Sequence, residues 1–135
     1  GRVGTPERGY MGRLPGVLEE TLISIRNNTP VYVAGGFGGC ARVIVDALMG
    51  TQRPEITTDY QYSIPHTQLL AEFCDDLHCD WEYFDGAFEA LSRCGFRGLK
   101  NGLTLAENIE LSQCVSASRI VELVLRGLHN VTSKP

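Results

Sequence analysis

Residues 30–48 constrain the fold most, because a glycine-rich loop there separates a short apolar segment from a helical pattern. Residues 30–34 are β-branched or aromatic at their centre and predict a strand. Four of the next five residues, 35–39, are glycine. Residues 40–49 then repeat apolar side chains with the helical period. The sequence therefore predicts a strand, a glycine loop and a helix in succession.

A glycine loop at the start of a helix favours phosphate binding. The first N–H groups of a helix have no partner within it, and the positive end of its dipole lies there. Glycine lets an anion approach the backbone because it has no Cβ. A tight turn without any ligand is the alternative. The candidate contacts are Gly35, Gly36, Phe37, Gly38 and Gly39, together with Arg42 one turn into the helix.

A second glycine-rich loop, residues 9–14, runs into a helix predicted over residues 15–27. Pro15 suits the first helical position, and two glutamates suit the first turn. These carboxylates either accept ribose hydroxyls or only complement the helix dipole. The candidate contacts here are Arg2, Gly12, Arg13, Gly16, Glu19 and Glu20.

Four further helices are predicted, over residues 68–73, 83–94, 104–113 and 118–128. Thr104 and Glu107 have the spacing of a capping box at the start of the third. The last helix is expected to bury a stripe formed by Ile120, Val121, Val124 and Leu128.

Composition limits the classes of function. The net charge of −4 argues against binding to nucleic acid, which requires a basic surface. No apolar run is long enough to span a membrane. Five cysteines without framework spacing indicate free thiols and a reducing, cytoplasmic compartment. Cys74, Asp75, His78 and Cys79 lack the paired spacing of a zinc site, so we expect neither a metal nor a cofactor.

The 135 residues suffice for one domain. The chain opens on glycine and loop-like sequence, so we expect a single domain over residues 1–135 that is an incomplete C-terminal fragment whose upstream strands are missing. Such a fragment is expected to form a homo-oligomer or to associate with its missing N-terminal half.

Two stretches carry a family resemblance. Residues 13–20 (Arg-Leu-Pro-Gly-Val-Leu-Glu-Glu) and 30–39 (Pro-Val-Tyr-Val-Ala-Gly-Gly-Phe-Gly-Gly) resemble the SLOG superfamily, which groups the DNA-processing protein DprA with the Lonely Guy phosphoribohydrolases. The chain looks closest to the SLOG domains of bacterial nucleotide-signalling and TIR-associated defence proteins. Residues 101–111 and 120–128 are similar to the end of such domains.

The resemblance implies a Rossmann-like α/β fold, helix-rich with few strands in this portion, that binds a nucleotide-type small molecule derived from ADP-ribose or NAD. A sensing role in antiviral signalling is the first hypothesis. The alternative is a nucleotide phosphoribohydrolase in which Glu20 is the catalytic glutamate. Val17 stands where the phosphoribohydrolases have threonine, and their upstream arginine has no counterpart, which favours sensing. A scaffold with tight turns only is the third reading.

Overall fold

The computed structural model describes residues 14–64, 69, 72 and 83–133. Two short 3-10 helices accompany the α-helices of this part, namely η1 (Pro54–Ile56) and η2 (Phe96–Leu99). The α-helices are α1 (Gly16–Arg26), α2 (Gly39–Leu48), α3 (Thr58–Tyr62), α5 (Tyr83–Cys94), α6 (Leu105–Gln113) and α7 (Ala117–Thr132). The helices predicted near α1, α2, α5, α6 and α7 are confirmed, whereas most of the helix predicted over 68–73 lies outside the described residues.

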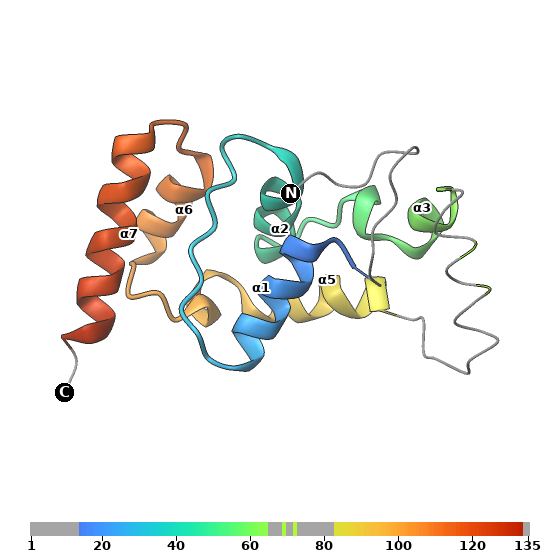
Figure 1. The fold of residues 1–135 in the computed structure, drawn as a ribbon, viewed down its shortest axis with the longest axis horizontal. Helices are drawn as coiled ribbons and strands as arrows, with labels where there is room; N and C mark the ends of the chain where they lie inside the picture. Colours follow the sequence, from blue (N-terminus) through green and yellow to red (C-terminus); the bar gives the residue numbers. More distant parts are fainter. Residues whose placement is uncertain (1–13, 65–68, 70–71, 73–82, 134–135) are drawn as a thin grey trace.

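Helices α1, α2 and α5 pack against one another and form the core (Figure 1). Leu18 of α1, Ile44 of α2 and Leu91 of α5 are buried in it. Helix α2 lies at its centre, because its last six residues, from Val43 to Leu48, are all buried. A helix that is apolar over most of its surface has to be covered on several sides.

The expected Rossmann-like sheet is wrong for the part of the chain that the structure describes, since no strand occurs there. Residues 29–35 are extended, and they run between the α1–α2–α5 core and the α6–α7 pair (Figure 1). A strand requires a neighbouring backbone. Here Val31 N donates to Leu99 O at 3.1 Å, and Val31 O accepts from the Asn101 side chain at 2.8 Å.

Asn101 holds the extended segment in place, and it is 2% exposed. Its Nδ2 donates to Val31 O and to Asn108 Oδ1, each at 2.8 Å, while its Oδ1 accepts from Leu103 N at 3.1 Å. The backbone carbonyl oxygen of Asn101 accepts a hydrogen bond from the Tyr32 hydroxyl at 2.8 Å. One buried amide therefore connects the segment to the loop before α6 and to α6 itself.

Helices α6 and α7 pack side by side, and the predicted capping box of Thr104 and Glu107 starts α6. Arg119 and Arg126 of α7 form ion pairs with Glu110 and Glu107 of α6, at 2.6 Å and 2.9 Å.

The stripe predicted for the last helix is wrong in part. The buried residues of α7 are Leu123 and Gly127. Of the four predicted residues, Ile120 and Val124 are half-buried, whereas Val121 and Leu128 are 54% and 42% exposed. Gly127 allows α7 to pack closely against the extended segment. A Cβ at this position would collide with Tyr32 and with the backbone carbonyl oxygen of Asn101.

Candidate functional site

The glycine loop ends at the N-terminus of α2. Gly38 N donates to Gly35 O at 3.0 Å and closes a turn. Gly38 and Gly39 have φ angles of 78° and 64°, which side chains rarely adopt, so this turn requires glycine. No side chain caps α2, and no acidic residue lies in its first turn. The positive end of the helix dipole is therefore not offset within the helix.

A cavity of about 320 Å³ opens at this helix end. It lies between the start of α2 and the connection that contains η1 and α3. Its lining comes from the glycine turn, from α2 and from residues 53–60, and consists of Gly38, Gly39, Arg42, Val43, Arg53, Glu55 and Tyr60.

Asp46 holds both cations of this cavity. It lies in the buried part of α2, with a side chain only 7% exposed. Its Oδ1 is 2.9 Å from Arg42 Nε, and its Oδ2 is 2.6 Å from Arg53 Nε. The hydrogen bond to Asp46, and then its charge, raise the pKa of the Arg53 guanidinium. One buried carboxylate thus positions two permanently charged groups that line the cavity.

The connection after α2 supplies the remaining wall. Pro54 begins η1, and the Thr57 side chain caps α3 by accepting from Tyr60 N at 3.3 Å. Gln61, which is fully buried, donates from Nε2 to the backbone oxygen of Glu55 at 2.6 Å. These bonds fix the backbone that carries an acidic and an aromatic side chain to the cavity.

The first half of the glycine loop has a packing role. A Cβ at Gly35 would meet the Ser112 carbonyl oxygen and a Val45 methyl group, each 2.8 Å away, and one at Gly36 would collide with the Cys114 carbonyl. Neither glycine lines the cavity. Phe37, the third candidate here, is 69% exposed. The structure therefore brings Gly38, Gly39 and Arg42 together, and it places the earlier loop residues elsewhere.

The second predicted loop is seen only in part. Arg2, Gly12 and Arg13 lie outside the described residues. Gly16, Glu19 and Glu20 are exposed on the first turns of α1, and none of the three lines the cavity at α2.

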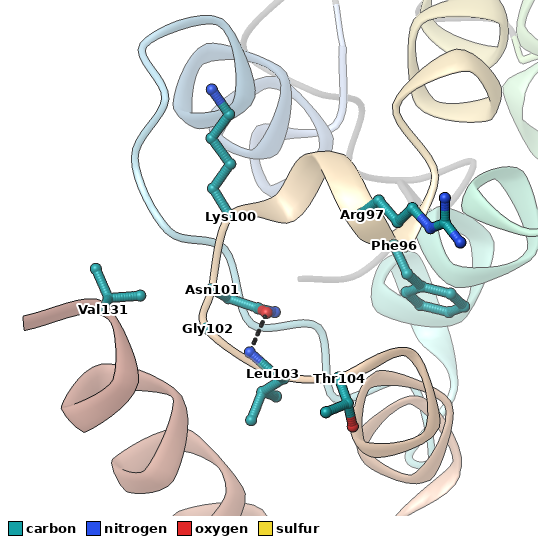
Figure 2. Close-up of a pocket in the computed structure, with 8 residues that line it drawn as sticks. All are labelled: Phe96, Arg97, Lys100, Asn101, Gly102, Leu103, Thr104 and Val131. Atoms are coloured by element: carbon teal, nitrogen blue, oxygen red, sulfur yellow. Dashed lines mark hydrogen bonds between the residues drawn. The ribbon is translucent and has the colours of Figure 1, made fainter. Parts of the chain in front are cut away.

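A larger cavity, of about 520 Å³, lies around η2 and the loop before α6 (Figure 2). Its two cations point to different sides: Arg97 points away from Lys100, whose ammonium bonds Asn28 Oδ1. Its polar groups, Asn101 and Thr104, are engaged in the fold and in the cap of α6. The residues that line this cavity therefore connect the α1–α2–α5 core to the α6–α7 pair. Its two cationic side chains do not point toward a common place.

Within the described part of the chain, no three His, Cys, Asp or Glu side chains are grouped closely enough to hold a metal ion. The residues weighed for zinc, Cys74, Asp75, His78 and Cys79, lie outside that part. None of its helices is both long and apolar enough to cross a membrane.

The sequence interpretation missed Arg53, Glu55 and Tyr60, because they lie in a polar connection without periodicity. One feature of the sequence does indicate that a cation lies close to α2. Asp46 interrupts the apolar run of α2, and a carboxylate in a buried position requires a cation. An arginine seven residues further along the chain meets that requirement.

The family model described as SLOG cluster2 matches residues 3–111. The chain belongs to this family, and the SLOG resemblance is confirmed. No curated protein and no solved structure matches the chain.

Proposed function

We propose that this SLOG-type chain binds a nucleotide-type ligand in the cavity at the N-terminus of α2, as a sensor of an ADP-ribose- or NAD-derived molecule. The observation that carries the proposal is the convergence of an uncapped helix N-terminus with Arg42 and Arg53 on one cavity. Backbone N–H groups and guanidinium groups are the donors that phosphate oxygens require.

The chemistry of the remaining lining supports a nucleotide over a simple anion. Tyr60 is 40% exposed and lines the cavity, so its ring is accessible to a base or sugar. The volume of about 320 Å³ lies at the small end of the range for ligand pockets, about 300–1,000 Å³. The cavity therefore suits one phosphorylated nucleoside unit of a larger molecule.

Sensing remains our preference over hydrolysis. The glutamate required by the phosphoribohydrolase alternative, Glu20, is exposed on α1 and is absent from the cavity lining. A hydrolase would need this carboxylate within reach of the ribosyl bond. An assay of glycosidic-bond cleavage with AMP and NAD tests that alternative, since turnover that disappears in Glu20→Gln would establish it.

The binding experiment begins with a thermal-shift screen of AMP, NAD, ADP-ribose and cyclic ADP-ribose, followed by calorimetry. Arg42→Ala and Arg53→Ala should each weaken the binding of the best ligand by about 1.5–3 kcal/mol, the contribution of a charge-assisted hydrogen bond. Arg93→Ala is the matched control, because Arg93 is exposed in the last turn of α5 and does not line the cavity. Equal effects in all three variants would contradict the proposal.

A further inference from the structure

Tyr60 presents an aromatic ring to the cavity at α2. Its side chain is 40% exposed and lines the cavity. Among the described residues, Tyr60 forms hydrogen bonds through its backbone only, whereas the hydroxyl group of Tyr32 is bonded to Asn101 O. Phe37 is an exposed aromatic residue too, but it does not line the cavity. The ring of Tyr60 is therefore available to a ligand in a way that these other rings are not.

The backbone that carries this ring is fixed by the fold. Tyr60 N donates to the Thr57 side chain at 3.3 Å, and Tyr60 O accepts from the Ser63 hydroxyl at 2.6 Å. The next residue, Gln61, is fully buried and donates to Glu55 O at 2.6 Å. A tyrosine side chain has only two torsion angles to restrict. A contact between this ring and a flat group of a ligand therefore costs little conformational entropy.

The charged groups of the cavity offset one another. Arg42 and Arg53 both bind Asp46. Glu55 lies in the same lining, and its charge also acts on Arg53. Because two carboxylates offset two guanidinium groups, net charge adds little to the hydrogen bonds that a phosphate would form here. A ligand needs a further contact to bind well, and the ring of Tyr60 provides a surface for it.

The ring favours one part of a nucleotide over the others. A base stacks on an aromatic side chain because both have π faces, and a sugar has no such face. The cavity of about 320 Å³ suits one nucleoside unit. An ADP-ribose-type molecule has two phosphorylated ends, of which one carries adenine and the other carries ribose alone. The end with the base is the one that Tyr60 can hold by stacking.

We infer that the cavity takes the adenosine phosphate end of the ligand, with the base stacked on Tyr60 and the phosphate at the start of α2. The terminal ribose of an ADP-ribose-type molecule then lies outside the cavity. This inference rests on the proposed function, because the phosphate site determines where the base lies. Tyr60 is a specificity-determining residue in this account, and Phe37 has no part in binding the base.

Calorimetry with AMP and ribose 5-phosphate on the full 135-residue chain tests the inference. The two molecules share the sugar and the phosphate, so the ratio of their affinities measures the contribution of the base. The wild-type chain should bind AMP about tenfold or more tightly than ribose 5-phosphate, as expected for one stacked base. Tyr60→Ala should reduce this ratio to about threefold or less by weakening AMP, and it should leave the affinity for ribose 5-phosphate unchanged.

Two further variants separate stacking from other roles of the side chain. Tyr60→Phe retains the ring and should keep the wild-type ratio. Phe37→Ala is the matched control, because it removes an exposed aromatic ring outside the cavity, and it should keep the ratio as well. A wild-type ratio in Tyr60→Ala would overturn the inference. A loss in Tyr60→Phe or in Phe37→Ala as large as the loss in Tyr60→Ala would overturn it too.

The outcomes also distinguish this inference from the proposed function. Equal wild-type affinities for AMP and ribose 5-phosphate would overturn the role of Tyr60 and leave the phosphate site at α2 standing. The absence of saturable binding for AMP, ribose 5-phosphate and ADP-ribose would overturn the proposed function, and the inference with it.

Discussion

Arg53 Nε donates a 2.6 Å hydrogen bond to Asp46 Oδ2, and this bond ties the connection after α2 to the buried face of that helix. Asp46 is 5% exposed as a residue, whereas the Arg53 side chain is 44% exposed. A buried anion thus anchors a partly exposed cation at the cavity. The same carboxylate holds Arg42, so the geometry of both guanidinium groups depends on one residue.

The first prediction concerns this anchor. Asp46→Asn keeps the shape and removes the charge that both arginines bind, so the free energy of unfolding should fall by about 1–3 kcal/mol. Asp59→Asn is the control, because Asp59 is exposed on α3, and it should change stability by about 0.5 kcal/mol or less. Urea unfolding followed by circular dichroism measures both. Equal losses would contradict the anchoring role.

The second prediction concerns the buried amide of Asn101. Asn101→Asp removes the donor to Val31 O and to Asn108 Oδ1, and it places a charge in a buried position. The free energy of unfolding should fall by about 3 kcal/mol or more. Asn130→Ala, which removes a bond from an exposed side chain to Gly102 O, should cost about 1 kcal/mol or less. A loss in Asn101→Asp no larger than in the control would contradict its joining role.

The third prediction is a pH dependence at the α6–α7 pair. Hydrogen bonds from Thr104 and Arg126 lower the pKa of Glu107 from its ordinary value of 4.5, and bonds from Arg119 lower those of Glu110 and Glu122. Because the folded state binds fewer protons than the unfolded chain, these pairs stabilise the fold above pH 4.5. That contribution is lost as the pH falls through the lowered pKa values.

Unfolding midpoints in urea between pH 7 and pH 3 measure this effect. The midpoint should decline below about pH 4.5, and Glu107→Gln should make the decline shallower. Glu89→Gln, on the exposed face of α5, is the control. A decline equally steep in Glu107→Gln would show that the acid sensitivity lies elsewhere.

The fourth prediction concerns self-association of the chain. Val121, Leu125 and Leu128 form an exposed apolar face at positions i, i+4 and i+7 of α7, with exposed fractions of 54%, 60% and 42%. Sedimentation velocity should detect concentration-dependent dimers, and Leu125→Glu should shift them to monomers. Arg93→Glu, on α5, should not. A wild-type monomer at all concentrations would contradict this prediction.

Local signals predicted most helices correctly. The apolar period defined α1, α2 and α5, and the pairing of Thr104 with Glu107 marked the start of α6. These features depend on neighbours within one or two turns, which the sequence displays directly. The glycine turn at Gly38 was readable for the same reason.

The predictions were wrong or incomplete where contacts between residues far apart in the sequence determine the structure. The segment around Val31 has strand propensity, but its contacts are Leu99 and Asn101, about seventy positions further along the chain. The buried side of α7 is set by close contact at Gly127, which periodicity alone did not distinguish from the exposed stripe. Arg53 and Glu55 line the cavity because the connection after α2 folds back toward the start of that helix. No local sequence pattern predicts this folding back.

The central claim is that a nucleotide phosphate binds at the turn before α2, and two glycine variants test it directly by calorimetry with AMP. Gly38 and Gly50 both have a φ near 80°, with values of 78° and 80°, and an added Cβ would have no close contact at either. Both variants should lose stability through backbone strain. Gly38→Val should lose about 1–3 kcal/mol, because the φ of 78° and ψ of −151° at Gly38 lie in a region that is essentially restricted to glycine. Of these two glycines, Gly38 lines the cavity and Gly50 does not. At a temperature where both variants are folded, Gly50→Val should bind AMP as the wild-type chain does, and Gly38→Val should not bind it. Unchanged AMP affinity in Gly38→Val would contradict the phosphate site at α2.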